Sequence, residues 1–365
     1  MALLIGLCAN TSMAEARETL SGALLLAYQG NPDLNAQRAN LRVVDENVPQ
    51  ALGGYRPRVN IGVNAAAAQS DGTLAGATVK YRTLPVQAGL TVTQTVFDGF
   101  RTDNKTRLAE SQVYSQRETL RGVESNILFG AAVAYMNLLR DTAIYALQQN
   151  NVEVLQEQLR QTRIRLEEGQ VTLTDVSQAE ARLAVAQAQL STGESTLQSS
   201  IGAFRQVVGV EPHDLAPGRP IDEFIPHDRD AVIATAFRDN PGIIAARHDV
   251  DVAEAQVKIA EGQLYPQLTA SASLEGNHDL PPLSNSPRPN SSSISGIVQG
   301  RLTVPLYEGG VVYSEIRQAK ERVGQRRIEV ESIRDRVRYN VVTAWGGSRS
   351  FEGCSHCIAE GGHCQ

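Results

Sequence analysis

Apolar residues recur at steps of three and four along two long stretches between positions 101 and 209. The first stretch, residues 101–168, contains no proline, and only Gly122 and Gly130 interrupt its helix-forming residues. The second, residues 176–208, arranges its apolar residues in heptads with one position skipped: Val176, Ala179, Leu183, Ala186, Leu190, Leu197, Ile201, Phe204 and Val208. The first stretch has apolar residues that can pack against this stripe: Val152, Leu155, Leu159 and Leu166. This spacing predicts a coiled-coil hairpin. At 1.5 Å per residue its first arm would span about 100 Å, a length typical of a rod or a tunnel wall.

Alternating apolar and polar residues predict four strands outside the hairpin. Residues 59–67 and 86–93 form one pair, joined by a loop rich in glycine and threonine near 71–77. Residues 268–274 and 294–304 form the other, joined by a loop at 277–293. Strands of about ten residues with one apolar face are typical of a membrane β-barrel. Four strands do not close a barrel, and open edges in lipid leave backbone groups unpaired, so several chains are expected to share one barrel. A soluble β-sandwich is the alternative.

The order of elements returns about 209 residues later. A helix over residues 20–29 is followed by a second helix that starts at Asn31-Pro32 and ends near position 53, and Asn240-Pro241 matches this start. Pro57 and Pro266 precede the outgoing strands, and the turns Phe97-Asp98-Gly99 and Tyr307-Glu308-Gly309 follow the returning ones. This predicts a duplicated unit, with repeat 1 at residues 17–209, a linker at 210–228 and repeat 2 at 229–345.

The two ends of the chain depart from this pattern. Residues 1–16 read as a signal peptide with an Ala14-Glu15-Ala16 cleavage site, and a lipoprotein cysteine at Cys8 is the weaker interpretation. Residues 346–365 hold five glycines, three cysteines and two histidines. A zinc site there is one interpretation; a frameshift that leaves the second helical hairpin incomplete is the preferred one. The apolar stripe of residues 315–342 is then expected to lack its ascending partner helix.

In these residues the chain resembles the TolC family of outer-membrane efflux and secretion ducts. The Asn-Pro helix starts, the prolines before the strands, both strand-to-helix turns and the hairpin tip at 169–176 carry the resemblance. It implies a mainly α fold with a β-barrel contribution of four strands per chain, in a homotrimer with a twelve-stranded barrel. The barrel would lie in the lipid of the bacterial outer membrane and continue into a periplasmic helical tunnel. The implied partners are a periplasmic adaptor (membrane fusion) protein and an inner-membrane pump or ABC secretion transporter.

The hairpin tip also has a local explanation. Gly169 suits the end of the descending helix, and Thr172 or Thr174 can cap the ascending one, with Asp175 favourable near its N-terminus. The resemblance implies that the tip contacts the adaptor and that Thr174 and Asp175 link neighbouring hairpins; helix capping alone is the alternative. The residues expected at this contact are Gly169, Val171, Thr172, Leu173, Thr174 and Asp175.

The remaining chemistry argues against an enzyme. The net charge of −6 disfavours nucleic acid, no apolar run approaches the 18 residues of a membrane helix, and no P-loop or other catalytic motif occurs. Four His-Asp dipeptides are too scattered for a metal or acid–base site, so no cofactor or metal is expected. Arginines between positions 317 and 338 predict a solvated helix face with glutamate partners. The expected function is a passive export duct; an inactive truncated product and a soluble coiled-coil scaffold are the alternatives.

Overall fold

The computed structural model describes residues 18–74, 77–218, 228–280 and 292–359. The chain divides into two compact units, the first formed by residues 1–40 and 120–228 and the second by residues 41–119 and 229–365. Helix α4, Arg101–Glu167, begins in the second unit and continues through the first. The expected signal peptide lies outside the described residues.

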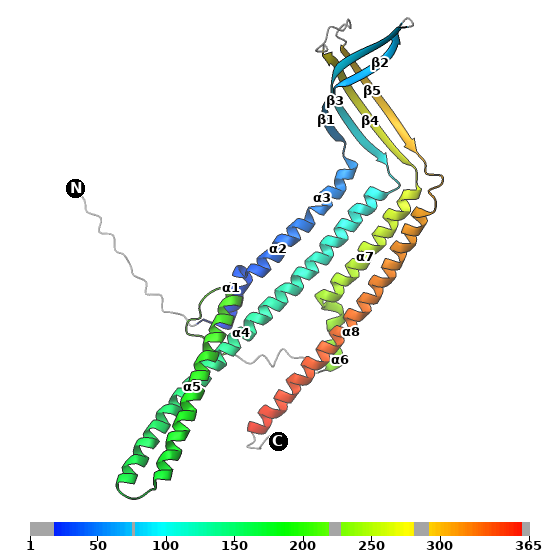
Figure 1. Cartoon of the computed structure of the whole chain (residues 1–365). Helices are drawn as coiled ribbons and strands as arrows, with labels where there is room; N and C mark the ends of the chain where they lie inside the picture. The colour runs from blue at the N-terminus through cyan, green and yellow to red at the C-terminus, as the bar shows by residue number, and fades with distance from the viewer. Residues whose placement is uncertain (1–17, 75–76, 219–227, 281–291, 360–365) are drawn as a thin grey trace, which may run out of the picture. The chain divides into compact units, whose positions relative to one another are not determined.

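The first unit contains the predicted helical hairpin. Helix α4 runs without a break through Gly122 and Gly130, and helix α5, Leu173–Val208, returns beside it (Figure 1). Val176, Ala186, Phe204 and Val208 of the heptad stripe are buried, which confirms the predicted seam. The skipped heptad position is Gly193, and a Cβ there would collide with the Gln148 side chain on α4. The seam therefore admits a polar side chain where its apolar pattern is interrupted.

Helix α1, Leu20–Gly30, packs on this hairpin. Its Ala23 and Ala27 share a buried cluster with Tyr135 of α4 and Phe204 of α5. The Tyr135 hydroxyl lies 2.8 Å from the Glu18 carbonyl oxygen and 2.6 Å from that of Ala216, so it ties the segment before α1 to the segment after α5. Burial raises the pKa of this phenol.

The predicted second helix is interrupted. The Asn31 carboxamide oxygen accepts the N–H groups of Asp33 (3.0 Å) and Leu34 (3.2 Å), which confirms the cap of α2, Pro32–Asp45. A turn at Glu46 separates α2 from α3, Asn47–Leu52, and from the 3-10 turn η1, Gly53–Tyr55. Pro49 explains the break, because its nitrogen cannot donate to the carbonyl of Asp45 and its ring crowds that turn.

The second unit contains an antiparallel sheet in the order β1-β3-β4-β5, so the two predicted strand pairs lie together. The strands are β1 Arg58–Ala65, β2 Ala68–Leu74, β3 Ala77–Phe97, β4 Gln267–Leu280 and β5 Ser292–Thr303. The loop predicted near 71–77 is wrong for most of its length, because β2 pairs with the first third of β3 there. β3 extends well beyond β1, and β2 supplies the backbone partners that this extension needs. Strands β4 and β5 likewise extend into the loop predicted at 277–293.

The strand register confirms a sheet with two different faces. Val59, Val92, Ala272 and Val298 form one cross-strand row, and Ile61, Leu90, Leu274 and Gly296 form the next. The alternate rows are mainly polar or small: Arg58, Thr93, Ser271 and Gln299, then Asn60, Thr91, Ser273 and Ile297. The apolar side chains are not covered by protein, since Val298 is 87% exposed and Ile61 is 78% exposed.

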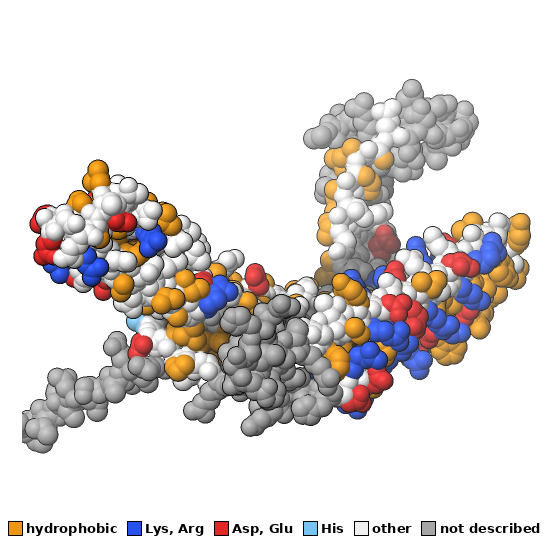
Figure 2. Space-filling model, turned by 90° about the horizontal axis from the view of Figure 1, so that it is seen from below, with side chains coloured by type: hydrophobic (Ala, Val, Ile, Leu, Met, Phe, Trp, Pro, Cys, Tyr) orange, Lys and Arg blue, Asp and Glu red, His pale blue; other side chains and the backbone are white. Residues whose placement is uncertain are grey.

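Helices α6, Arg229–Asp239, α7, Pro241–Glu261, and α8, Val311–Ala359, complete the second unit, with a 3-10 turn η3, Gly262–Leu264, after α7. α7 packs along α8 through Val257, Ala319 and Val323. The predicted pairing of arginines with acids on α8 is confirmed by Arg327–Glu254 (2.7 Å), Arg326–Glu329 (2.7 Å) and Arg334–Glu331 (2.8 Å). In Figure 2 basic and acidic side chains are interspersed along the helices rather than separated by sign.

Three features of the described helices bear on the expectations from sequence. α8 continues as helix through residues 346–359, because its glycines weaken a helix without blocking its hydrogen bonds as proline would. α7 and α6 both pack on α8, and the Arg338 guanidinium lies 5.2 Å from the Phe237 ring centre. Neither helix is the ascending arm that the apolar stripe of α8 is expected to lack. By length and composition alone, α4 contains one 18-residue window apolar enough to cross a membrane, although Ala131 and Leu138 of this helix are buried against protein.

Candidate functional site

The hairpin tip is a short turn whose ends are both capped. Gly169 has φ +70°, the left-handed conformation predicted for it, and the Gln170 N–H donates to the Arg165 carbonyl at 2.8 Å. Thr172 precedes α5, and the Asp175 carboxylate accepts both its N–H and its hydroxyl at 2.8 Å. Thr172 is therefore the cap residue, and Thr174 lies inside the first helical turn.

The tip presents both polar and apolar side chains to solvent. The hydrogen bonds from the Thr172 backbone and hydroxyl lower the pKa of Asp175, so its carboxylate is charged at neutral pH. Leu173 is 71% exposed beside it, and Val171 is half-buried. An ion pair between Arg163 and Glu180 at 2.7 Å fastens the two arms just behind the turn. Five of the six residues named for the tip are thus exposed on a capped turn, and Val171 is half-buried.

The first strand-to-helix turn is a compact junction at the base of the sheet. The Asp98 carboxylate accepts the Thr102 N–H at 2.9 Å and the Thr102 hydroxyl at 2.6 Å, which caps α4. Gly99 has φ +68°, and a Cβ there would collide with the carbonyl oxygen of Gly262 in η3. Gly262 in turn packs under the Arg101 side chain, whose Cγ would lie 2.5 Å from an added Cβ. The turn from repeat 1 is therefore fitted directly against repeat 2.

Aromatic side chains surround this junction. The Phe97 and Phe100 rings meet edge to face with centres 5.3 Å apart, and Phe100 meets Tyr265 in the same way at 6.5 Å. Tyr55 is half-exposed nearby, and its pKa is raised by burial and then by the carboxylates of Asp103 and Asp98. Amphipathic aromatic residues at the end of an apolar sheet face are typical of a membrane–water boundary.

The second strand-to-helix turn has the same backbone but a different surface. Gly309 and Gly310 have φ +63° and +82°, and α8 begins at Val311. Leu306 is 93% exposed and Tyr307 is 88% exposed. These two residues, with Leu264, Val312 and Tyr313, line a mainly apolar cleft of about 260 Å³. The residues of both turns named from the sequence lie where expected, and the apolar cleft was not foreseen.

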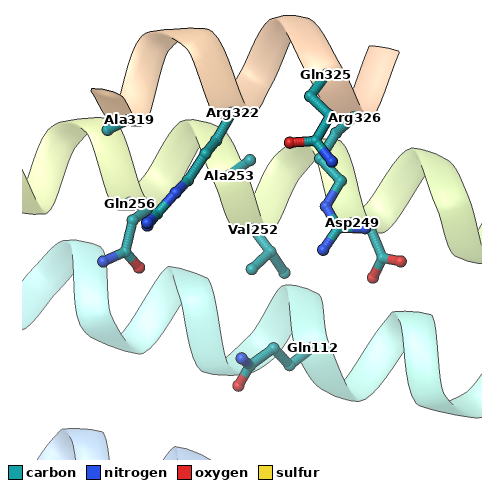
Figure 3. A pocket seen from close by; sticks show the side chains of 9 residues that line it. All are labelled: Gln112, Asp249, Val252, Ala253, Gln256, Ala319, Arg322, Gln325 and Arg326. Atoms are coloured by element: carbon teal, nitrogen blue, oxygen red, sulfur yellow. The ribbon is translucent and has the colours of Figure 1, made fainter. Parts of the chain in front are cut away.

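A larger polar cleft lies in the groove between α4, α7 and α8. Its volume is about 510 Å³, and Figure 3 shows its side chains projecting from the three helices. Most of the charge in it is already paired, since Arg326 binds Glu329 and the Asp249 carboxylate accepts the Ser115 hydroxyl at 2.7 Å. The rest of the wall consists of the Arg322 side chain, amide groups and small apolar side chains, which suits bound water better than a specific ligand.

The histidines singled out in the sequence are dispersed. His213 follows α5, His248 stacks at 5.5 Å on Tyr114 and lies 3.3 Å from Asp251, and His278 is in β4. His227 and the cysteines after position 353 lie outside the side chains that the structure describes. Among the described residues, no group of three potential metal ligands converges.

Comparison with known proteins agrees with this geometry. Residues 23–210 and 232–347 match the family of outer membrane efflux proteins. The chain is 37% identical over 337 residues to the outer membrane efflux protein BepC of Brucella suis, covering 92% of this chain and 71% of that protein. It is 25% identical over 333 residues to TolC of Escherichia coli, covering 87% of this chain and 65% of that one.

Solved structures share the fold at lower identity. The Vibrio cholerae outer membrane protein VceC superposes with a TM-score of 0.72 at 18% identity, covering 93% of this chain and 81% of that one. The Campylobacter jejuni CmeC outer membrane channel gives a TM-score of 0.71 at 15% identity, with 94% and 77% covered.

The sheet with an uncovered apolar face and the long helical hairpin define an outer-membrane channel protein with a periplasmic helical part. The chain belongs to the outer membrane efflux protein family of TolC-like channels, which transport without catalysing a reaction. Channels of this family are trimeric and work with efflux-pump partners.

Proposed function

We propose that this chain forms a homotrimeric duct in the outer membrane and serves as the passive exit of an efflux pump or a type I secretion system. The observation that carries the proposal is the sheet itself. Its apolar rows are uncovered, and β1 and β5 are edge strands without a further partner among the described residues. Lipid tolerates the exposed apolar face, but it does not tolerate two open rows of backbone N–H and C=O groups.

Three copies satisfy both edges at once. If β1 of one chain pairs with β5 of the next, the sheets of three chains close a ring. The edge strands β1 and β5 then each gain the second neighbour that they lack in a single chain. The Arg58 and Asn60 rows then face the interior, and the Val59 and Ile61 rows face lipid. A soluble scaffold would instead need a second apolar layer on the sheet.

Disulfide trapping tests the ring. The four natural cysteines are replaced by serine, and Asn60→Cys on β1 is combined in turn with Ser293→Cys, Ser295→Cys and Gln299→Cys on β5. Oxidation of membranes is expected to give a covalent trimer for at least one pair. The matched control combines Asn60→Cys with Ser273→Cys on the inner strand β4 and is expected to stay monomeric. A chain that remains soluble and uncrosslinked in every pair would contradict the proposal.

The tip at 169–175 is proposed as the contact with a periplasmic adaptor protein. Its supporting features are an apolar Leu173 beside a charged Asp175 on a turn held rigid by its own caps. Such a surface buries an apolar anchor with little loss of conformational entropy. An inner-membrane pump or ABC transporter supplies the energy, since the chain carries no nucleotide-binding motif.

A further inference from the structure

We propose that a basic cleft at the base of the sheet binds a multivalent phosphoryl-type oxyanion on the polar face. The cleft has a volume of about 260 Å³. It is bounded by η1, the ends of β1, β3 and β4, and the first turns of α4. Four cationic side chains line it: Arg56, Arg58, Arg101 and Lys105.

The cations of the cleft lack acidic partners. Asp98 is the one carboxylate in the described lining, and Thr102 already donates two hydrogen bonds to it. Among the described residues, none of the four cations forms an ion pair, and the Arg101 Nε is buried without a hydrogen-bond acceptor. A buried guanidinium donor without an acceptor costs free energy, and four like charges around one cleft repel each other. A bound anion relieves both costs.

The cleft also offers uncharged hydrogen-bond donors, namely threonine hydroxyl groups. Thr93, Thr95 and Thr269 come from neighbouring strands and lie on the polar face, since Thr93 pairs with Arg58 and Thr95 pairs with Thr269. Arg301 lies on the same face, directly across from Thr269. Planar guanidinium groups with hydroxyl donors are the combination that recognises tetrahedral oxyanions. A singly charged halide would leave most of these donors unused.

The second repeat provides an internal comparison. At the matching positions it has Tyr265 for Arg56, Gln267 for Arg58, Val311 for Arg101 and Glu315 for Lys105. The second junction forms the same strand-to-helix turn without any of the four cations. The basic residues are therefore not required by the fold of the turn, which is consistent with a shared role in binding a ligand.

Equilibrium dialysis of labelled inorganic phosphate against the full chain in a neutral detergent tests the proposal at constant ionic strength. Saturable binding is expected, with sulfate competing and chloride not. Arg101→Gln with Lys105→Gln is expected to weaken binding at least about tenfold, since each charge-assisted bond is worth a factor of this size. The charge-matched control is Arg107→Gln with Arg117→Gln on the same helix, outside the cleft, and it should bind as the natural chain does.

Two further arms make the result decisive. Because the Arg101 side chain packs on Gly262, Arg58→Gln with Lys105→Gln repeats the test with exposed side chains only, and circular dichroism verifies folding. Competition by phenyl phosphate identifies a soluble source of the phosphoryl group, whereas competition by phosphatidylglycerol in the micelles identifies a lipid headgroup. Non-saturable uptake, or equal loss in the control pair, would overturn the proposal. The binding measurement does not need the trimer, so its failure is distinct from failure of the duct.

Discussion

Asp141 is the one aspartate buried in the described part of the chain, at 4% exposure, and it joins the two arms of the hairpin. Its carboxylate accepts a hydrogen bond from the Ser200 hydroxyl on α5 at 2.5 Å and one from Arg140 at 2.8 Å. The bond from Arg140, followed by that from Ser200, lowers the pKa of Asp141. A buried acid held by both arms fixes their register in a way that the apolar seam alone does not.

The first prediction concerns the stability of this link. Asp141→Ala should lower the free energy of unfolding by about 1–3 kcal/mol, because it removes a buried carboxylate and the hydrogen bond that the half-buried Ser200 hydroxyl donates to it. Because the folded-state pKa of Asp141 is depressed, its stabilisation is present above the ordinary value of 3.8 and is lost as pH falls through the folded value. Asp141→Asn should therefore reduce the acid-induced loss of stability, measured by urea unfolding between pH 7 and pH 3.

The adjacent pair Arg238-Asp239 provides the control for this measurement. It repeats the same dipeptide geometry at 2.8 Å, but both side chains are exposed. Asp239→Asn should change the free energy of unfolding by less than about 0.5 kcal/mol, as exposed pairs usually do. Equal effects at positions 141 and 239 would show that burial and Ser200 add nothing.

Single residues were the hardest part to predict from sequence. Asp141 looks like any polar residue of an amphipathic helix until α5 brings Ser200 beside it. The basic cleft is hidden for a similar reason, since Arg58 and Arg101 lie 43 positions apart and meet only through the pairing of β1 with β3. Gly169 was predictable because its left-handed conformation has a local reason that does not depend on distant contacts. A cap at the start of α5 was predictable on the same ground, although the sequence left Thr172 and Thr174 as alternatives.

At the scale of elements, sequence patterns with a clear period were sufficient to predict helices and strands. The heptad stripe predicted α5 and its buried seam, and the alternating rows predicted the faces of β1, β3, β4 and β5. The errors arise where composition was used in place of period. Gly72 and Thr73 suggested a loop, yet β2 forms because β3 extends beyond β1 and needs a neighbour. The packing of α6 on α8 has no sequence signal, because neither helix is distinctive on its own.

The second prediction concerns the caps of the hairpin tip. Asp175→Ala removes the acceptor for two donors of Thr172 and should destabilise the start of α5 by about 1 kcal/mol. Thr172→Pro should be more severe, because it removes the N–H that Asp175 binds. Hydrogen exchange across residues 170–180 should rise in both variants. Gln170→Ala is the control, because its side chain donates a hydrogen bond to the exposed Glu168 and takes no part in the Thr172–Asp175 cap.

The same variants separate capping from partner contact at the tip. Adaptor crosslinking should fall in Asp175→Ala and Thr172→Pro, and it should fall in Leu173→Ala without any change in hydrogen exchange. Leu173 is exposed and takes no part in the cap, so only a partner would register its loss. Natural levels of crosslinking in all three variants would mean that the turn is structural only.

At the scale of the whole molecule, the two repeats have kept one backbone plan and diverged in surface chemistry. Both supply an Asn-Pro helix start, a pair of long antiparallel strands and a glycine turn into a long helix, and repeat 1 adds the short strand β2. The cleft at the first junction is basic, and the cleft at the second is mainly apolar. Duplication preserves what the fold requires, namely caps, left-handed glycines and strand register. The side chains that differ between the copies are therefore not required by these shared features.

The last prediction tests the orientation of the sheet, on which membrane insertion depends. Val298 and Gln299 are neighbours on β5, and their side chains lie on opposite faces. Val298→Arg places a charge on the apolar face and should cost about 2–4 kcal/mol if that face meets the middle of the bilayer. Gln299→Arg places the same charge on the polar face and should be nearly neutral. The measurement is the fraction of protein recovered as a heat-modifiable oligomer in the outer-membrane fraction. A loss confined to Val298→Arg requires lipid on the apolar face and water on the other; equal recovery of both variants would mean that this face never enters a membrane.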